Sequence, residues 1–118
     1  MPRQLFKLIS KEYSEKFQEW WWTYEVLFEF IFNKRTITYI TITSYYQTKL
    51  GRKMITNELI LELLVKLNGK ILEAMEYDGN REPYEWEVFR QGKPYVLFFW
   101  FKDDTINHLW IRNCHWID

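Results

Sequence analysis

Apolar residues recur at every fourth position near the N-terminus and indicate a first helix. The stripe consists of Leu5, Ile9, Tyr13 and Phe17, and charged side chains such as Lys11 and Glu12 lie between its members. This spacing places one apolar face along a helix of about four turns. The pattern therefore predicts an amphipathic helix over residues 5–20.

From residue 22 the apolar positions alternate, which is typical of a strand. The alternating set comprises Trp22, Tyr24, Val26, Phe28, Phe30 and Phe32. A continued helix stays open as the alternative, because Trp20, Leu27 and Ile31 also fit helical spacing. After a polar turn at residues 33–35, residues 36–43 are almost all β-branched or aromatic, which favours a second strand. The two segments together predict a hairpin.

A second helix is expected at residues 56–67. Thr56 is a suitable N-cap, and the apolar stripe behind it consists of Ile60, Leu63, Leu64 and Leu67. Gly69 suits the left-handed conformation that often follows the last turn of a helix. The N-cap, the apolar stripe and the glycine thus all indicate a helix in this segment.

The remaining chain contains four segments of β character, residues 70–77, 84–91, 95–102 and 107–117. Their short connections predict an antiparallel meander. Residues 95–101 are apolar at both odd and even positions, so this strand should be central and covered on both faces. Helices should cover one face, and a partner chain could cover the other. The sequence thus predicts a single α+β domain over residues 1–118. It should have an antiparallel sheet of about six strands and two helices, in the order α-β-β-α-β-β-β-β.

Composition narrows the functional classes. The chain has nine Phe, eight Tyr and seven Trp, and its 16 basic residues balance 16 acidic ones. A net charge of zero gives no overall attraction to nucleic acid or to an anionic membrane, and it opposes association only weakly. A protein partner or a homo-oligomer is therefore expected. The single cysteine, Cys114, excludes an intramolecular disulfide, and the sequence suggests neither a signal peptide nor a membrane span, so we expect a soluble cytoplasmic protein.

The last predicted strand carries a row of chemically varied side chains. On one parity lie His108, Trp110, Arg112, Cys114 and Trp116. Arg112 could hold an anion while a neighbouring indole stacks on a base. The alternative is an ordinary strand that buries its Trp and Cys side chains. Zinc is disfavoured, because Cys114 and His115 point to opposite faces of a strand and a fourth ligand is lacking. No metal or cofactor is expected.

Charged residues form one basic and one acidic segment. Lys49, Arg52 and Lys53 precede the second predicted helix, whose free amide groups would help them to bind a phosphate. The alternative is that they are solvated loop charges. Glu85 and Glu87 share one face of a strand within an acidic stretch. They are either a solvated face or a surface that docks onto a basic protein.

Three consecutive tryptophans, Trp20, Trp21 and Trp22, cannot all enter the same core. At least one is expected to be exposed or to lie in an interface with a protein partner. The alternative is a corner of the fold where all three rings cover the edges of the core.

Residues 44–118 combine a tyrosine-rich segment, a basic loop, a helix and four strands. The pattern begins with Tyr45-Tyr46-Gln47-Thr48-Lys49 and continues through Ile55–Ile60. It resembles the small RNA-cutting toxins of bacterial toxin–antitoxin pairs. The chain departs from that family in having Ser44 where a His is frequent, and in lacking a strongly basic balance.

The resemblance implies a ribonuclease that cuts without a metal. His108 or Tyr45 would act as the base, cations would stabilise the phosphorane, and aromatic rings would stack the bases. The cations would be Lys49, Arg52 and Arg112, and the stacking rings Trp110 and Trp116. The alternative function is a non-enzymatic immunity- or antitoxin-like inhibitor or another protein-interaction module. Such a module would bind its partner through the three tryptophans and the acidic strand.

Overall fold

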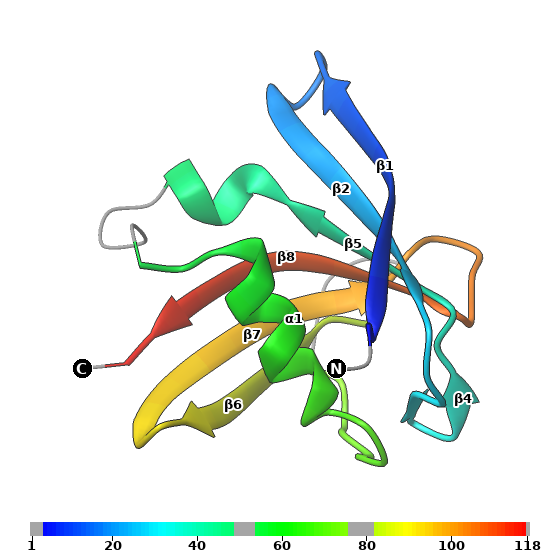
Figure 1. Ribbon diagram of the computed structural model, residues 1–118, viewed down its shortest axis with the longest axis vertical. Helices are drawn as coiled ribbons and strands as arrows, with labels where there is room; N and C mark the ends of the chain where they lie inside the picture. The colour runs from blue at the N-terminus through cyan, green and yellow to red at the C-terminus, as the bar shows by residue number, and fades with distance from the viewer. Residues whose placement is uncertain (1–3, 49–53, 76–81, 118) are drawn as a thin grey trace.

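The computed structural model describes residues 4–48, 54–75 and 82–117, which form a six-stranded sheet with one α-helix packed against it (Figure 1). The spatial order of the sheet is β1 (Phe6–Ser14), β2 (Glu19–Val26), β5 (Tyr39–Thr43), β8 (His108–Trp116), β7 (Lys93–Phe101) and β6 (Tyr84–Arg90). A separate ribbon pairs β3 (Ile31–Phe32) with β4 (Arg35–Thr36). The 3-10 turn η1 (Ser44–Thr48) and the helix α1 (Asn57–Val65) connect the two halves of the sheet.

The prediction of an α+β domain with two helices is wrong, because residues 6–14 form β1. This strand pairs antiparallel with β2 along its whole length, with a register shift between Leu8 and Ser10. A spacing of four residues is also a multiple of two, so the apolar stripe fits the strand period as well as the helix period. The described residues thus form a mostly-sheet domain with a single α-helix.

The prediction of an antiparallel sheet is also wrong, because β5 and β8 run parallel. Strands β1, β2 and β5 form one antiparallel set, and β8, β7 and β6 form another. The chain crosses from the first set to the second through η1 and α1, and crossovers of this kind place parallel strands side by side. The parallel pair is therefore the one seam between two antiparallel halves.

Other predicted elements agree in part with the structure. Strands were correctly predicted near residues 84–91, 95–102 and 107–117, and the hairpin of the N-terminal half is present as β2 and β5. β2 ends at Val26, however, and Phe30 is fully buried in the core instead of continuing a strand. Residues 71–75 are not in a strand, and residues 76 and 77 of the predicted strand lie outside the described residues.

The helix predicted at residues 56–67 is present as α1, which ends two residues earlier than predicted, at Val65. The Thr56 side chain accepts a hydrogen bond from the backbone N–H of Leu59, as an N-cap does. The apolar stripe is fully buried: Ile60, Leu63, Leu64 and Leu67. It packs on alternate residues of the central strands, Ile40, Ile42, Leu97, Phe99, Leu109 and Ile111. The core thus lies between α1 and one face of the sheet, and the opposite face is called the outer face below.

Candidate functional site

The outer face carries aligned side chains across five strands, in two neighbouring cross-strand rows. The strand register aligns Glu12 with Trp21 between β1 and β2, and Thr23 with Thr41 between β2 and β5. The second row continues from Thr41 to Trp110 on β8 and then to Trp100 on β7. Because neighbours in strand register project from the same face, residues far apart in the sequence meet here.

A cavity of about 360 Å³ lies over these rows. We call it the outer-face pocket. Its aromatic residues are Phe17, Trp21, Trp100 and Trp110, its charged residues are Glu12, Glu19, Lys102, Asp103 and Arg112, and its hydroxyl residues are Thr23 and Thr41. Its size falls within the ~300–1,000 Å³ range of ligand-binding pockets, and such pockets also combine apolar walls with a few polar groups. The pocket is therefore the candidate functional site.

A buried ion pair forms one end of the pocket. The guanidinium of Arg112 contacts both carboxylate oxygens of Glu19 at 2.7 Å, and Glu19 is only 6% exposed. The indole N–H of Trp21 donates to the same carboxylate at 2.8 Å. A buried charge is tolerated when it is paired and hydrogen-bonded in this way. The pair therefore fixes Arg112 and leaves it little capacity to attract a further anion.

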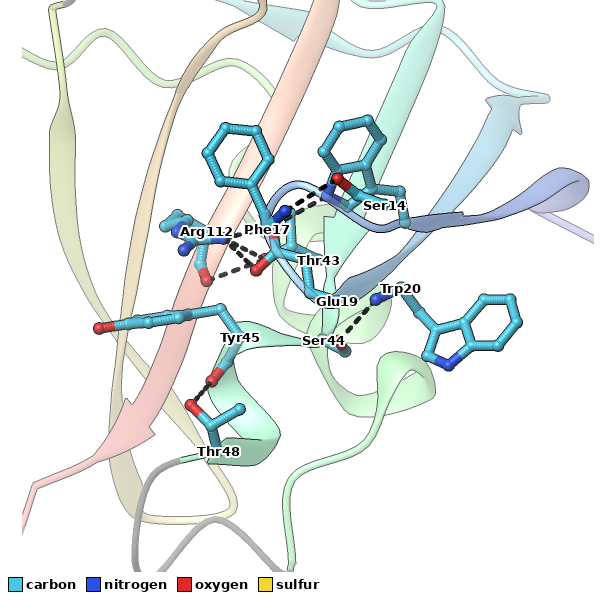
Figure 2. A network of polar contacts seen from close by, with 10 residues as sticks. Ser14, Phe17, Glu19, Trp20, Thr43, Ser44, Tyr45, Thr48 and Arg112 are labelled. Carbon is cyan, nitrogen blue, oxygen red and sulfur yellow. Dashed lines mark hydrogen bonds and ion pairs between the residues drawn. The ribbon is translucent and has the colours of Figure 1, made fainter.

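The ion pair rests on the 3-10 turn η1 (Figure 2). The ring of Tyr45 lies under the Arg112 guanidinium at 4.0 Å, and the Thr43 hydroxyl donates to the backbone carbonyl of Arg112. The Ser44 hydroxyl accepts the backbone N–H of Trp20 at 2.8 Å, which holds the start of β2 against the turn. The Trp20 ring itself points away from the ion pair (Figure 2). The end of β5 and the turn η1 thus position both partners of the pair.

His108 contacts Thr41, a residue of the pocket lining, in a chain of hydroxyl contacts. Its Nε2 atom is 2.7 Å from the Thr41 hydroxyl, which is in turn 2.8 Å from the hydroxyl of Thr23. Burial, together with the positive charge of Lys102, lowers the pKa of His108 from 6.5 to about 4. The imidazole is therefore neutral near pH 7 and is engaged with Thr41.

The predicted row on the last strand is split by an irregularity of the sheet. The pairing of β7 with β8 shifts between Phe98 and Phe99, so one residue of β8 is extra. His108, Trp110 and Arg112 consequently face outward, whereas Cys114 is buried in the core. Trp116 pairs with Tyr95, packs against the core and lies under the ammonium of Lys93 at 5.2 Å. The interpretation of all five residues as one row was wrong.

The three consecutive tryptophans point in different directions. Trp20 is 39% exposed and contacts Tyr13 and the ammonium of Lys11. Trp21 lines the outer-face pocket, and Trp22 packs against the core. Trp21 therefore lies on the other face of β2 from Trp20 and Trp22, and it is the one of the three that lines the pocket; partner binding by the three residues stays a prediction.

The acidic pair lies on the same face as the pocket. Glu85 and Glu87 are exposed on β6, the edge strand, opposite Phe98 and Val96 of β7. Alternation along β7 places Val96, Phe98 and Trp100 on the outer face. The basic loop of Lys49, Arg52 and Lys53 lies outside the described residues, so its expected phosphate site is not located.

Sequence reasoning missed several residues of the pocket. Glu19 and Trp100 were not singled out, and Phe17 was assigned to a helix stripe. A buried glutamate has no local signature in a sequence, because its burial depends on Arg112, 93 residues further along the chain. Trp100 was hidden by its place in an apolar run.

The described residues contain no group of three or more His, Cys, Asp or Glu side chains that could hold a metal ion. Within the same residues, none of the helices has the length and apolar character needed to cross a membrane.

Comparison with known proteins provides no relative for this geometry. The chain matches no protein-family model, no curated protein sequence and no solved structure. The resemblance of residues 44–118 to RNA-cutting toxins stays a prediction.

Proposed function

We propose that this protein is an immunity- or antitoxin-like binding module that docks a basic protein partner through the outer face of its sheet. The observation that carries the proposal is the group of aromatic and acidic side chains on the face opposite α1, Trp21, Trp100 and Trp110 with Glu12, Glu19 and Asp103. Half-buried tryptophans rimmed by polar groups are typical of the centres of protein interfaces.

The charge of the outer face supports a basic partner. Strand alternation and the pocket lining give six carboxylates on this face: Glu12, Glu19, Glu25, Glu85, Glu87 and Asp103. They give three cations: Lys7, Lys102 and Arg112. Six minus three leaves an excess of three negative charges on a chain whose net charge is zero. A face of this kind speeds encounter with a positively charged surface and repels nucleic acid.

The geometry gives less support to the ribonuclease alternative. Arg112 is neutralised by Glu19, so its charge is not available to stabilise a phosphorane. The Nε2 atom of His108 contacts Thr41, and its pKa of about 4 makes it a weak base. Tyr45 contacts the Arg112 guanidinium through its ring, at 4.0 Å.

The test uses charge reversal on the edge strand. The tagged chain is incubated with an extract of cells that express it naturally, and retained proteins are identified by mass spectrometry. We expect the wild type to retain a basic protein that the Glu85→Lys/Glu87→Lys variant loses. The matched control is Glu58→Lys/Glu62→Lys, which makes the same charge change on α1, on the opposite side of the sheet. This control should retain the partner.

The affinity of the identified partner is then measured by calorimetry at two salt concentrations. We expect binding to weaken as the salt rises, because screening shortens the range of the attraction. Equal retention by all three chains, or a partner without a basic surface, would refute the proposal. Cleavage of RNA by the purified wild type, abolished in His108→Ala and Arg112→Ala, would support the ribonuclease instead.

A further inference from the structure

The walls of the outer-face pocket are aromatic rings set at a steep angle to each other. The Trp21 and Trp110 rings have centroids 5.0 Å apart and an interplanar angle of 75°. Trp100 is the cross-strand neighbour of Trp110, and the Phe17 ring lies 6.1 Å from Trp21. The face of an aromatic ring is electronegative, so rings that meet at a steep angle form a cage that attracts a compact cation.

The charges around the cage balance and do not oppose a cation. Glu19 and Arg112 neutralise each other in their ion pair. The lining also contains two carboxylates, Glu12 and Asp103, and the ammonium of Lys102. The ammonium of Lys16 lies 5.3 Å from the centroid of the Phe17 ring, so one wall of the cage already contacts a cation of this chain. The aromatic faces, together with the two carboxylates, therefore provide the attraction for a further cation.

The polar groups at the floor are compatible with an ammonium. Thr23 and Thr41 contribute hydroxyl oxygens to the lining, and a hydroxyl oxygen can accept an N–H hydrogen bond. His108, which contacts the Thr41 hydroxyl, is neutral near pH 7, because its pKa is lowered to about 4. The imidazole therefore adds no positive charge that would oppose the ligand.

We infer that the outer-face pocket is a receptor for a lysine side chain of the protein partner, an inference that rests on the proposed function. A lysine ammonium is compact and carries its charge on a slender alkyl stem, which suits a cage with steeply inclined walls. An arginine guanidinium is planar and stacks best on a single ring. The alkyl stem would contact the indoles while the ammonium faces Glu12 and Asp103.

The experiment titrates the purified full chain with Nα-acetyl-lysine methylamide at low ionic strength. Binding is followed by the indole N–H signals in ¹H–¹⁵N NMR spectra, assigned through single Trp→Phe variants. We expect saturable shifts of the Trp21 and Trp110 signals, with the Trp20 signal unchanged. The uncharged norleucine analogue, the arginine analogue and uridine monophosphate are titrated in the same way, and each should bind more weakly.

The variant Glu12→Gln/Asp103→Asn removes two charges while it preserves the shape of both side chains. We expect it to weaken lysine binding by about 2- to 5-fold, the range of a surface electrostatic or cation–π contact. Replacement of Trp110 with Leu should weaken binding at least as much, whereas Trp20→Leu, outside the pocket, should not. The dispersion of the NMR signals of each variant is compared with that of the wild type, and unchanged dispersion would show that the variant is folded.

Several outcomes would overturn the inference. They are the absence of shifts at Trp21 and Trp110, equal binding of the norleucine analogue, preference for the arginine analogue, and preference for the nucleotide. These outcomes are separate from failure of the proposed function. If the partner is lost by Glu85→Lys/Glu87→Lys but the lysine probe does not bind, the pocket inference alone fails. If the edge-strand variant keeps the partner, the proposed function fails whatever the probe does.

Discussion

The Glu19–Arg112 ion pair makes a quantitative prediction about stability. The variant Glu19→Gln keeps the shape of the side chain and can still accept the indole N–H of Trp21, but it leaves Arg112 without its counter-charge. Breaking a buried ion pair from one side costs ~3–5 kcal/mol. Arg112 is 23% exposed and keeps the Tyr45 ring at 4.0 Å. Part of its charge therefore stays solvated, and we expect a loss of about 2 kcal/mol.

Substitution of the other partner, Arg112, should lower the free energy of unfolding by more. In Arg112→Met the Glu19 carboxylate keeps the Trp21 indole as a donor, but it is only 6% exposed, so solvent compensates it less than it compensates Arg112. We expect a loss of about 3–4 kcal/mol, within the range for a buried charge left without its partner. The double variant should be more stable than the sum of the single effects implies, with a coupling energy of about 2 kcal/mol.

The free energy of unfolding is measured by urea denaturation at pH 7, followed by tryptophan fluorescence and far-UV circular dichroism. The exposed ion pair between Glu62 and Arg90 provides a matched control, since Glu62→Gln should change stability by less than ~0.5 kcal/mol. A loss in Glu19→Gln no larger than in this control would refute the reasoning. So would a milder effect of Arg112→Met, or strictly additive effects in the double variant.

Three further predictions concern a titrating group, a helix cap and a turn. The native pKa of His108 is lowered from its unfolded value of 6.5 to about 4, so its contribution to stability is complete above pH 6.5 and is lost as the pH falls toward 4. This shift corresponds to at most ~3.4 kcal/mol, and the half-buried imidazole keeps part of its solvation, so a His108→Gln variant should lack roughly 2 kcal/mol of this pH dependence, as measured by urea denaturation across that range. Thr56→Ala removes the acceptor for the Leu59 N–H and should cost about 1 kcal/mol, and Thr56→Ser should restore most of it. Gly92 has φ +78° and open space around it, so Gly92→Ala should cost about 1 kcal/mol through backbone strain alone, and a thermal midpoint equal to that of the wild type would contradict this.

Local signals predicted α1 well and β1 poorly. The N-cap, the apolar stripe and the glycine after the helix all lie in or next to α1, so residues 56–69 alone were sufficient to predict the helix. At residues 5–17, an apolar stripe with a spacing of four residues fitted both the helix period and the strand period. The segment forms a strand because it pairs with β2, and residues 5–17 alone carry no signal for that pairing. The strands of the C-terminal meander were recognisable because short polar turns separate them.

The candidate site was less predictable than the fold, because its residues come together only through the alignment of neighbouring strands in the sheet. Arg112 and Trp110 were identified as chemically unusual, and both line the pocket. Their partners Glu19, Trp21 and Trp100 come from two other strands, β2 and β7, and only the strand order brings them together. The irregularity opposite Phe98 has no sequence signal, and it alone removes Cys114 and Trp116 from the face that was predicted for them.

The parallel seam between β5 and β8 also has a consequence for folding. Each antiparallel half of the sheet can form from contacts near in sequence, but the seam joins Tyr39 to His108 and must wait until nearly the whole chain is present. Both the Glu19–Arg112 pair and the Thr41–His108 contact cross between these halves. The pocket therefore exists only after the halves have joined. A ligand held there stabilises the joined state, and an incompletely synthesised or half-folded chain cannot bind.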